Sequence, residues 1–262
     1  MRIATWNVNS IRARLDRVLA WLGRSDVDVL AIQETKSRDD QFPYEAFASA
    51  GYEAAHLGSS GWNGVAIVSR VGLGEVDRGF PNQPTWGEPP EAEARALGAT
   101  CSGVRVWSLY VPNGRTLDDP HYVYKLDWLG RLREAAAMWL DADPSGKILL
   151  AGDWNIAPQD DDVWDMRVFA HSTHVSAAER AAFGAIVDVG YADVVRPHAP
   201  GPGVYTYWDY TRLRFPRREG MRIDFALASP ALADRVTGAY IDRQERKGKG
   251  ASDHAPVVVD FS

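Results

Sequence analysis

The stretch Ile148-Leu149-Leu150-Ala151-Gly152-Asp153-Trp154-Asn155 sets an acid and an amide directly after a run of apolar residues. An apolar run of this length, bounded by turn residues, is typical of a strand that is buried on both faces. Such a strand has no structural use for a carboxylate at its tip, because an unpaired buried charge is strongly destabilising. The stretch therefore predicts a buried strand that ends in chemically active groups.

Three further apolar stretches lead into, or out of, polar residues of the same kinds. They are residues 3–7, 27–34 and 252–259. The polar groups end the first two of these strands, whereas Asp253 and His254 precede the last one. All four tips can meet at one sheet edge if the last strand runs antiparallel to its neighbours. An edge of that kind can hold a cation and a substrate.

The composition predicts one domain in a reducing compartment. The chain has 262 residues, of which 45 % are hydrophobic, and no repeat or linker divides it, so residues 1–262 are expected to form a single domain. The one cysteine, Cys101, cannot form an internal disulfide, which fits the cytosol. The N-terminus lacks the apolar core of a signal peptide, and no run approaches membrane-spanning length. We therefore expect a soluble cytoplasmic protein with no membrane partner.

The charge distribution favours an anionic substrate. The formal net charge of −6 argues weakly against nucleic acid, but the distribution of charge matters more than its sum. For any one basic cluster, a solvated loop or an exposed helix face is the favoured explanation. Three clusters flank the predicted strand tips, which shifts the balance toward anion binding. They are Arg12, Arg14 and Arg17; Arg212, Arg214, Arg217, Arg218 and Arg222; and Arg243, Arg246, Lys247 and Lys249.

The periodicity of apolar residues predicts a layered α/β fold with mixed sheets. Helices are expected at residues 11–22, 43–50, 120–140 and 176–187. Strands are expected at residues 2–7, 27–34, 52–56, 63–70, 95–101, 104–110, 147–153, 203–207, 221–228, 236–242 and 256–261. Hairpin-like connections among the crossovers argue against an all-parallel, doubly wound sheet.

Glu34 is the first candidate for chemistry. A carboxylate at a strand end is a natural ligand for a hard cation such as Mg²⁺, and Asn7 ends the neighbouring strand. The alternative is a local ion pair between Glu34 and Lys36, and for Glu34 taken alone that alternative is the stronger one.

Asp153 and Asn155 form the second candidate. They lie two residues apart, so in an extended chain both side chains project to the same side. The acid can take a proton from water while the amide positions it. Acids and amides are also common turn residues after strands, although Gly152 and the bulky Trp154 make a simple turn less favourable.

Asp253 and His254 form the most specific pair. Histidine titrates near neutral pH and donates hydrogen bonds to phosphate, particularly when a carboxylate orients its other nitrogen. Asp224 lies inside an apolar stretch and needs a partner, for which His254 is the candidate. The alternative partner of Asp224 is a core arginine.

Other residues carry weaker signals. The segment 205–210 places four aromatic residues beside the arginine-rich stretch, where they can pack in the core or stack on bases. His171 and His174 lie three residues apart but have no further ligands near them in the sequence, so a zinc site is not expected.

Taken in order, these motifs resemble those of the exonuclease III family of abasic-site endonucleases, bacterial branch. The matching motifs are Trp6-Asn7-Val8-Asn9, Gln33-Glu34-Thr35-Lys36, Tyr110-Val111-Pro112-Asn113-Gly114, Gly152-Asp153-Trp154-Asn155, Tyr205 to Tyr210, Arg222-Ile223-Asp224 and Ser252-Asp253-His254. The resemblance spans residues 3–258. It implies the fold of the endonuclease/exonuclease/phosphatase superfamily, a DNase I-like four-layer α/β-sandwich in which helices flank two mixed β-sheets.

The resemblance also implies roles for the residues of the centre. Glu34 would bind Mg²⁺ or Mn²⁺, with Asn7 and Asp253 close by. Asp153 would activate the attacking water, and Asn155 would position it. The short set of carboxylates favours one metal ion over two, although only weakly.

The phosphate and the DNA would be held by further matched residues. His254, paired with Asp224, would hold the scissile phosphate, and Tyr110 and Asn113 would contact that phosphate or the leaving group. The residues expected to contact DNA are Asn113, Arg115, Tyr207, Trp208, Arg214, Arg217, Arg218 and Met221. Tyr207 and Met221 stand where relatives have Trp, and Asn9 replaces an Asp of the animal enzymes.

The implied reaction is hydrolysis on the 5′ side of abasic sites in duplex DNA, which leaves a 3′-hydroxyl. Degradation from 3′ to 5′ and removal of blocked 3′ ends would use the same centre, in a monomer. A phosphatase of the superfamily that acts on phosphoinositides or sphingomyelin would lack the aromatic segment beside five arginines. A DNA-binding protein that has lost catalysis would lack some of the acidic, amide and histidine residues of the centre, and this chain keeps them.

Overall fold

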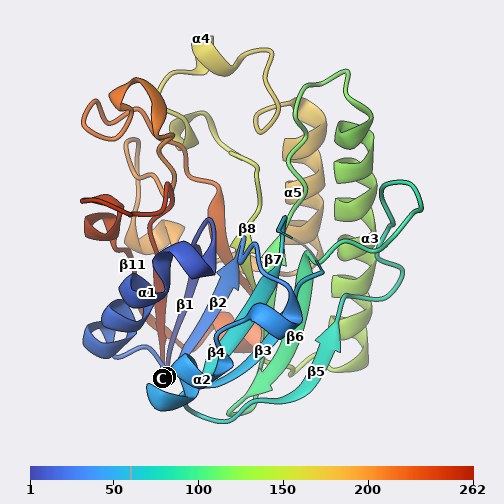
Figure 1. The fold of residues 1–262 in the computed structure, drawn as a ribbon. Helices are drawn as coiled ribbons and strands as arrows, with labels where there is room; N and C mark the ends of the chain where they lie inside the picture. The colour runs from blue at the N-terminus through green and yellow to red at the C-terminus, as the bar shows by residue number, and fades with distance from the viewer. Residues whose placement is uncertain (60) are drawn as a thin grey trace.

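The computed structural model describes residues 1–59 and 61–262, and within them two six-stranded sheets lie between layers of helices (Figure 1). The first sheet has the order β11-β12-β1-β2-β4-β3, with β1 (Arg2–Asn7), β2 (Val29–Gln33), β3 (Glu53–Leu57), β4 (Val65–Ser69), β11 (Val236–Ile241) and β12 (Val257–Phe261). The second has the order β5-β6-β7-β8-β10-β9, with β5 (Gly74–Arg78), β6 (Ala96–Cys101), β7 (Val104–Tyr110), β8 (Ile148–Asp153), β9 (Ala192–Asp193) and β10 (Asp224–Ala228).

Both sheets are mixed, as the sequence predicts. β1 pairs in parallel with β2, and β7 pairs in parallel with β8, whereas the other pairings are antiparallel. β12 runs antiparallel to β1, with Val257 opposite Thr5, which confirms the expected direction of the last strand. The residues that end β1 and β8 and the loop that precedes β12 consequently lie at one edge of the sandwich.

The described helices are α1 (Ile11–Ser25), α2 (Tyr44–Ser49), α3 (Pro120–Ala142), α4 (Met166–Phe169), α5 (Ala177–Val189) and α6 (Pro230–Ala233). Helices α1 and α2 cover the outer face of the first sheet, and α3 and α5 cover that of the second (Figure 1). Trp21 of α1 packs edge-on against Trp6 of β1, with ring centroids 5.4 Å apart. Trp128 of α3 and Phe183 of α5 pack on the second sheet. The four-layer α/β-sandwich is therefore confirmed.

Apolar side chains from the facing sides of both sheets fill the central layer. Ile3 and Val29 of the first sheet pack in one cluster with Val106 and Leu149 of the second. A buried polar bridge also crosses this layer, because Gln33 Nε2 donates to Ser108 Oγ at 3.0 Å. The bridge lies one residue before Glu34, so it holds the two sheets together next to the predicted site.

The arrangement differs from the sequence prediction at residues 203–207. Only Tyr207 pairs there, in isolated bridges to Met221 and His254. Thr206 Oγ1 accepts from the backbone N–H groups of Ile223 and Asp224 at 3.1 Å, so a side chain satisfies donors that a ladder would use. Because these N–H groups are bound by the Thr206 side chain, β10 begins at Asp224 and not at residue 221, where the sequence predicted its start.

Two strands of the second sheet were not predicted. All residues of β5 are exposed, and its sequence Gly-Glu-Val-Asp-Arg has no apolar face. β9 has only two residues. Strands of these kinds carry too little hydrophobic periodicity to be recognised.

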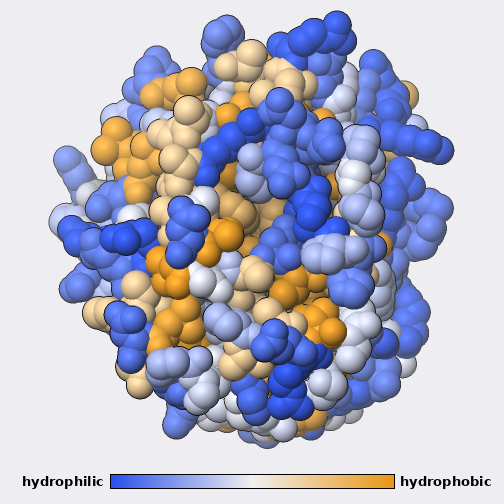
Figure 2. Space-filling view, turned by 180° about the vertical axis from the view of Figure 1, so that it is seen from behind, coloured by the Kyte–Doolittle hydropathy of each residue, from blue (hydrophilic) through white to orange (hydrophobic). Residues whose placement is uncertain are grey.

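One face of the surface carries mostly polar side chains (Figure 2). On the face opposite that of Figure 1, hydrophilic residues predominate and hydrophobic ones gather in small groups between them (Figure 2). Within the described part of the chain, every helix is too short or too polar to cross a membrane.

The structure predicts that Gly152→Ala will be strongly destabilising. Gly152 has φ 155°, and a Cβ placed there would lie 1.9 Å from the carbonyl oxygen of Leu109 in the adjacent strand. Overpacking costs about 1–3 kcal/mol or more, and here the obstacle is backbone that cannot rotate away. The free energy of unfolding, measured by urea titration of tryptophan fluorescence, should fall by at least that amount.

The matched control is Gly130→Ala in α3, where an added Cβ meets nothing within 4 Å. This change should be neutral or stabilise the helix by up to about 1 kcal/mol. Equal urea midpoints for both variants would show that the close approach of β7 to β8 is wrong.

Candidate active site

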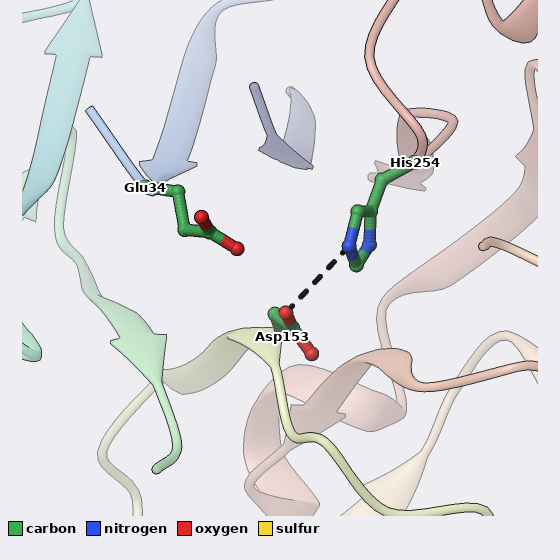
Figure 3. A group of neighbouring side chains, drawn as sticks. All are labelled: Glu34, Asp153 and His254. Atoms are coloured by element: carbon green, nitrogen blue, oxygen red, sulfur yellow. Dashed lines mark ion pairs between the residues drawn. The ribbon is translucent and has the colours of Figure 1, made fainter. Parts of the chain in front are cut away.

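Side chains from both sheets converge on one space at the shared edge. Glu34 follows β2, Asp153 ends β8 and His254 lies in the loop before β12 (Figure 3). One ligand atom from each lies within 4.8 Å of the other two. His254 Nε2 is 3.8 Å from Asp153 Oδ2, the contact that Figure 3 marks with a dashed line. The predicted meeting of these strand tips is thus confirmed.

Asn7 lies between the two carboxylates and orients them. Its Nδ2 donates to Glu34 Oε1 at 2.8 Å and to Asp153 Oδ2 at 2.9 Å. Its Oδ1 accepts from the backbone N–H of Asn9 at 3.0 Å, which fixes the direction of the amide. Asn7 therefore presents its side-chain N–H groups to the two carboxylates. Its amide oxygen, which a metal ligand would have to direct at the ion, faces the Asn9 backbone instead.

Glu34 is held in a constrained backbone conformation. Its φ of 52° lies in the left-handed region, and its carbonyl accepts from Ser10 N at 2.7 Å. The local ion pair considered from the sequence also exists, with Lys36 Nζ 2.9 Å from Oε2. Burial opposes the charge of Glu34, but Lys36 and the Asn7 amide outweigh it and lower the pKa. Glu34 is consequently ionised and able to bind a cation.

Asp153 is poised to exchange a proton near neutral pH. Its Oδ1 accepts from the backbone N–H of Asn155 at 2.9 Å, while its Oδ2 faces Asn7 and His254. Burial, opposed by the nearby His254, raises the pKa of Asp153 to about 7. A carboxyl with such a pKa can act as a general base at physiological pH.

His254 pairs with Asp224, as the sequence predicts. Its Nδ1 lies 2.8 Å from Asp224 Oδ2, and both side chains are buried. Burial disfavours the imidazolium, but the carboxylates of Asp224 and Asp153 more than compensate and raise the pKa of His254 to about 10. A protonated ring has no lone pair for a metal, so His254 offers a charged N–H to an anion instead.

Asp253 lies outside the group of three ligand atoms. Its Oδ1 accepts from Asn9 Nδ2 at 3.1 Å, and the backbone of Asn9 in turn contacts Asn7. Of the three residues expected to hold a metal, Glu34 is the one whose ligand atom belongs to the group. Asn7 contacts Glu34 directly, and Asn9 links Asn7 to Asp253.

Asn155 and Asn113 extend the site beyond the group formed by Glu34, Asp153 and His254. Asn155 has φ 50°, and its Nδ2 donates to the carbonyl of Val111 at 2.9 Å. Asn113 Nδ2 lies 3.3 Å from Asn155 Oδ1. Burial and the neighbouring Glu34 carboxylate raise the pKa of Tyr110 well above its ordinary value, so the phenol keeps its proton and remains a donor.

The expected DNA-contact residues do not all reach the surface. Trp208 is 1 % exposed and packs edge-on against Phe215, with ring centroids 5.2 Å apart. It is a core residue, so the prediction that it contacts DNA is corrected. Arg222 is fully buried and paired with Asp193 at 2.8 Å, which removes it from the basic surface cluster. Arg222 is therefore not the partner of Asp224, which pairs with His254.

The remaining arginines are partly committed to local ion pairs. Arg214 and Arg217 both pair with Glu219, and the Arg214 guanidinium also lies 5.0 Å from the Trp164 ring centroid. Arg115 lies 3.7 Å from Asp119. To bind DNA, each of these arginines would have to leave its carboxylate partner for a phosphate.

Two hollows adjoin the centre. One, of about 330 Å³, is lined by Trp164, Tyr207, Met221 and His174. The other, of about 920 Å³, reaches Tyr110 and Asn113, and Arg115 lines both. The expected contacts Asn113, Arg115, Tyr207 and Met221 thus border space that a substrate can enter.

Lys125 was missed from the sequence, and His174 was considered there only as a zinc ligand. Lys125 Nζ and His174 Nδ1 both lie 2.7 Å from the backbone oxygen of Asn155. Lys125 shares the buried face of α3 with Trp128, Leu129 and Leu132, and a lysine at the helical spacing of such apolar residues is a signal that could have identified it. Among the described residues, His174 belongs to no group of potential metal ligands.

The electrostatics predict that the His254 ring stays protonated at pH 8 in the metal-free protein. Because its pKa is raised on folding, its stabilising contribution is complete below about pH 6.5 and is lost as the pH rises through about 10. Asp224→Asn removes one carboxylate and should lower the titration midpoint, as read from the ring ¹⁵N shifts. A wild-type ring that is neutral at pH 8 would contradict the assigned charge.

Comparisons with known proteins agree with this geometry. Exodeoxyribonuclease III of Haemophilus influenzae is 29 % identical over 273 residues, covering 100 % of both chains. Exodeoxyribonuclease of Bacillus subtilis is 28 % identical over 266 residues, covering 99 % of this chain and 98 % of the relative. Both relatives are therefore similar along their whole length.

Solved structures give the same picture. A 3′-5′ exonuclease from Neisseria meningitidis matches with a TM-score of 0.94 at 38 % identity, covering 100 % of both chains. An AP endonuclease from Archaeoglobus fulgidus matches with a TM-score of 0.93 at 36 % identity, covering 100 % of this chain and 99 % of the other. The profile of the Endonuclease/Exonuclease/phosphatase family matches residues 4–254. The chain belongs to the Endonuclease/Exonuclease/phosphatase family.

Proposed function

We propose that the chain is a Mg²⁺-dependent DNA-repair nuclease that cleaves duplex DNA on the 5′ side of abasic sites. The same centre would degrade DNA from 3′ to 5′ and remove blocked 3′ ends. One observation carries this proposal: the buried His254 ring, Asp153 and Glu34 lie together at the shared edge of the two sheets. Similarity to both a 3′-5′ exonuclease and an AP endonuclease supports assigning the two activities to one centre.

The chemistry of the donor set fits a hard cation. Carboxylate oxygens are the protein ligands that Mg²⁺ and Mn²⁺ prefer, and Glu34 is an ionised carboxylate beside a second one. Glu34 would hold the ion. Asn7 orients the Glu34 carboxylate directly, and Asp253 is linked to Asn7 through Asn9. Lys36 forms an ion pair with Glu34, and binding of the metal ion would break this pair. When bound, Mg²⁺ supplies positive charge that neutralises the phosphate oxygens.

Asp153 and Asn155 would prepare the water. Asp153 can take the proton from an attacking water, since its pKa of about 7 matches the operating pH. The backbone N–H of Asn155 holds one oxygen of Asp153, while the side-chain amide of Asn155 binds the Val111 carbonyl and Asn113. Together the two residues would orient the water toward the phosphorus.

His254 and Tyr110 would stabilise the phosphate. Both keep a proton at neutral pH, so each presents a donor to the charge that develops on a phosphate oxygen. Asp224 holds the ring through Nδ1 and leaves Nε2 facing the site. The donors are oriented in advance, because their partners belong to the folded sheets.

The surroundings favour DNA over a phospholipid headgroup. The hollow of about 330 Å³ beside the centre is lined by Tyr207, Met221 and Trp164, which suits the sugar of an abasic site. Arg217 and Arg218 lie on the nearby segment and would contact the backbone. A monomeric state and a cytoplasmic location remain predictions from the sequence.

Incubation with Mg²⁺ and a duplex that contains one abasic-site analogue tests the proposal. Incision on the 5′ side of the analogue should occur and stop with EDTA. Asp153→Asn should lower kcat by at least about 100-fold, because a positioned base contributes about 10²–10⁴-fold. Product sizes on a denaturing gel report both results.

The matched control is Asp161→Asn, which makes the same change at an exposed site and should retain activity. Absent incision by the wild type, or incision unaffected by EDTA, would refute the proposed function. Near-normal turnover by Asp153→Asn would refute the role of Asp153 alone.

Binding of DNA should depend on salt through the arginine segment. Replacing Arg214, Arg217 and Arg218 by Ala should reduce the slope of log affinity against log salt by up to about 0.9 for each lost phosphate contact. Arg131→Ala, on the exposed face of α3, is the control and should leave the slope unchanged. Identical slopes for the triple variant and the wild type would mean that the segment faces away from DNA.

A further inference from the structure

A fully buried ion pair lies behind the proposed site and has no role in the steps above. Lys125 of α3 and Glu179 of α5 form it, and both side chains are 0 % exposed. Burying an ammonium and a carboxylate costs several kcal/mol per ion, and apolar residues of similar size often serve packing as well or better. The pair therefore calls for an explanation beyond the packing of two helices.

Lys125 makes a second contact that points toward the centre. Its Nζ donates to the backbone oxygen of Asn155 at 2.7 Å, and His174 Nδ1 lies 2.7 Å from the same oxygen. A carbonyl oxygen has two lone pairs, and both are engaged here. The peptide group that follows Asn155 is thereby held from two sides.

The backbone conformation of Asn155 sets where its polar groups point. Its φ of 50° is in the left-handed region, which is uncommon for residues other than glycine. Its backbone N–H binds Asp153 Oδ1 at 2.9 Å, and its side chain binds the Val111 carbonyl at 2.9 Å. A rotation of the following peptide would move both groups relative to the proposed water.

Glu179 does not depend on Lys125 for its hydrogen bonds. Its carboxylate also accepts from Thr173 Oγ1 at 2.7 Å, from His174 N at 2.9 Å, and from Ser176 Oγ at 2.7 Å and N at 3.2 Å. Removal of Lys125 would leave Glu179 with these donors. What Lys125 uniquely provides, therefore, is a cation at the Asn155 carbonyl.

We propose that Lys125 is a positioning residue, which Glu179 holds in place so that its ammonium locks Asn155 in the conformation required for catalysis. The inference rests on the proposed role of Asn155 in orienting the water. The Lys125 side chain is fully buried behind the site, so its loss should affect turnover more than substrate binding.

Kinetics of Lys125→Met on the abasic-site duplex test this inference. Methionine keeps the length of the side chain but removes the donor. We expect kcat to fall about 10–100-fold, as for other residues that orient catalytic groups, while KM changes by less than about threefold. Lys125→Met/Glu179→Gln, in which neither charge remains, should show the same split if the single variant folds poorly.

The control is Arg105→Met at the opposite end of β7, which removes the ion pair with Asp77 and should leave kcat unchanged. A second readout is the ¹⁵N-labelled side-chain amide of Asn155, whose NMR signal should shift or broaden in Lys125→Met and not in Arg105→Met. A folded Lys125 variant with wild-type kcat and an unchanged Asn155 signal would overturn the inference. If the wild type itself fails to incise, the proposed function fails, and the Asn155 signal still decides whether Lys125 holds that residue.

Discussion

The contact of His254 with Asp224 and Asp153 is the interaction on which the centre depends. The histidine precedes β12 of the first sheet, whereas both acids belong to strands of the second, where they lie directly opposite each other in the ladder. One buried cation therefore joins the two halves of the sandwich at their common edge. Without it, two carboxylates would face each other in a dry interior.

The polar bridge beneath this contact sets how closely the halves approach. Gln33 Nε2 donates to Ser108 Oγ at 3.0 Å, Thr5 Oγ1 donates to Gln33 Oε1 at 3.1 Å, and Ser108 Oγ donates to the carbonyl of Ile32 at 2.9 Å. Glu34 follows this bridge directly, so the position of the cation-binding carboxylate relative to Asp153 is inherited from the packing of the sheets. Lys125 provides comparable support to Asn155 from the helical layer.

The sequence predicted the parts of the site that end buried strands. Asp153, Glu34 and His254 were recognisable because acids and histidines next to apolar runs have no packing role, and the pairing of His254 with Asp224 followed from the need of a buried acid for a partner. The direction of β12 followed from requiring that all tips meet. These inferences use only short sequence patterns and the geometry of strand pairing, and the structure agrees with them.

The sequence could not predict contacts that depend on side-chain direction. Trp208 stands in a segment of aromatic and basic residues, yet its ring faces the core, and Arg222 is drawn inward by Asp193, a residue 29 positions away. The orientation of the Asn7 amide depends on the backbone of Asn9. Lys125 reaches Asn155 across 30 positions. Such pairings are decided by tertiary packing, which no local pattern encodes.

Proton release on metal binding tests the central claim most directly. Because burial raises the pKa of the Asp153 carboxyl to about 7, a cation held by Glu34 beside it should lower that pKa and release a proton. Calorimetric titration of the wild type with Mn²⁺ in buffers of different ionisation enthalpy should therefore show a net release of protons, which disappears together with tight binding in Glu34→Gln. Binding of Mn²⁺ without proton release, or with equal strength in Glu34→Gln, would contradict a single centre built from both sheets.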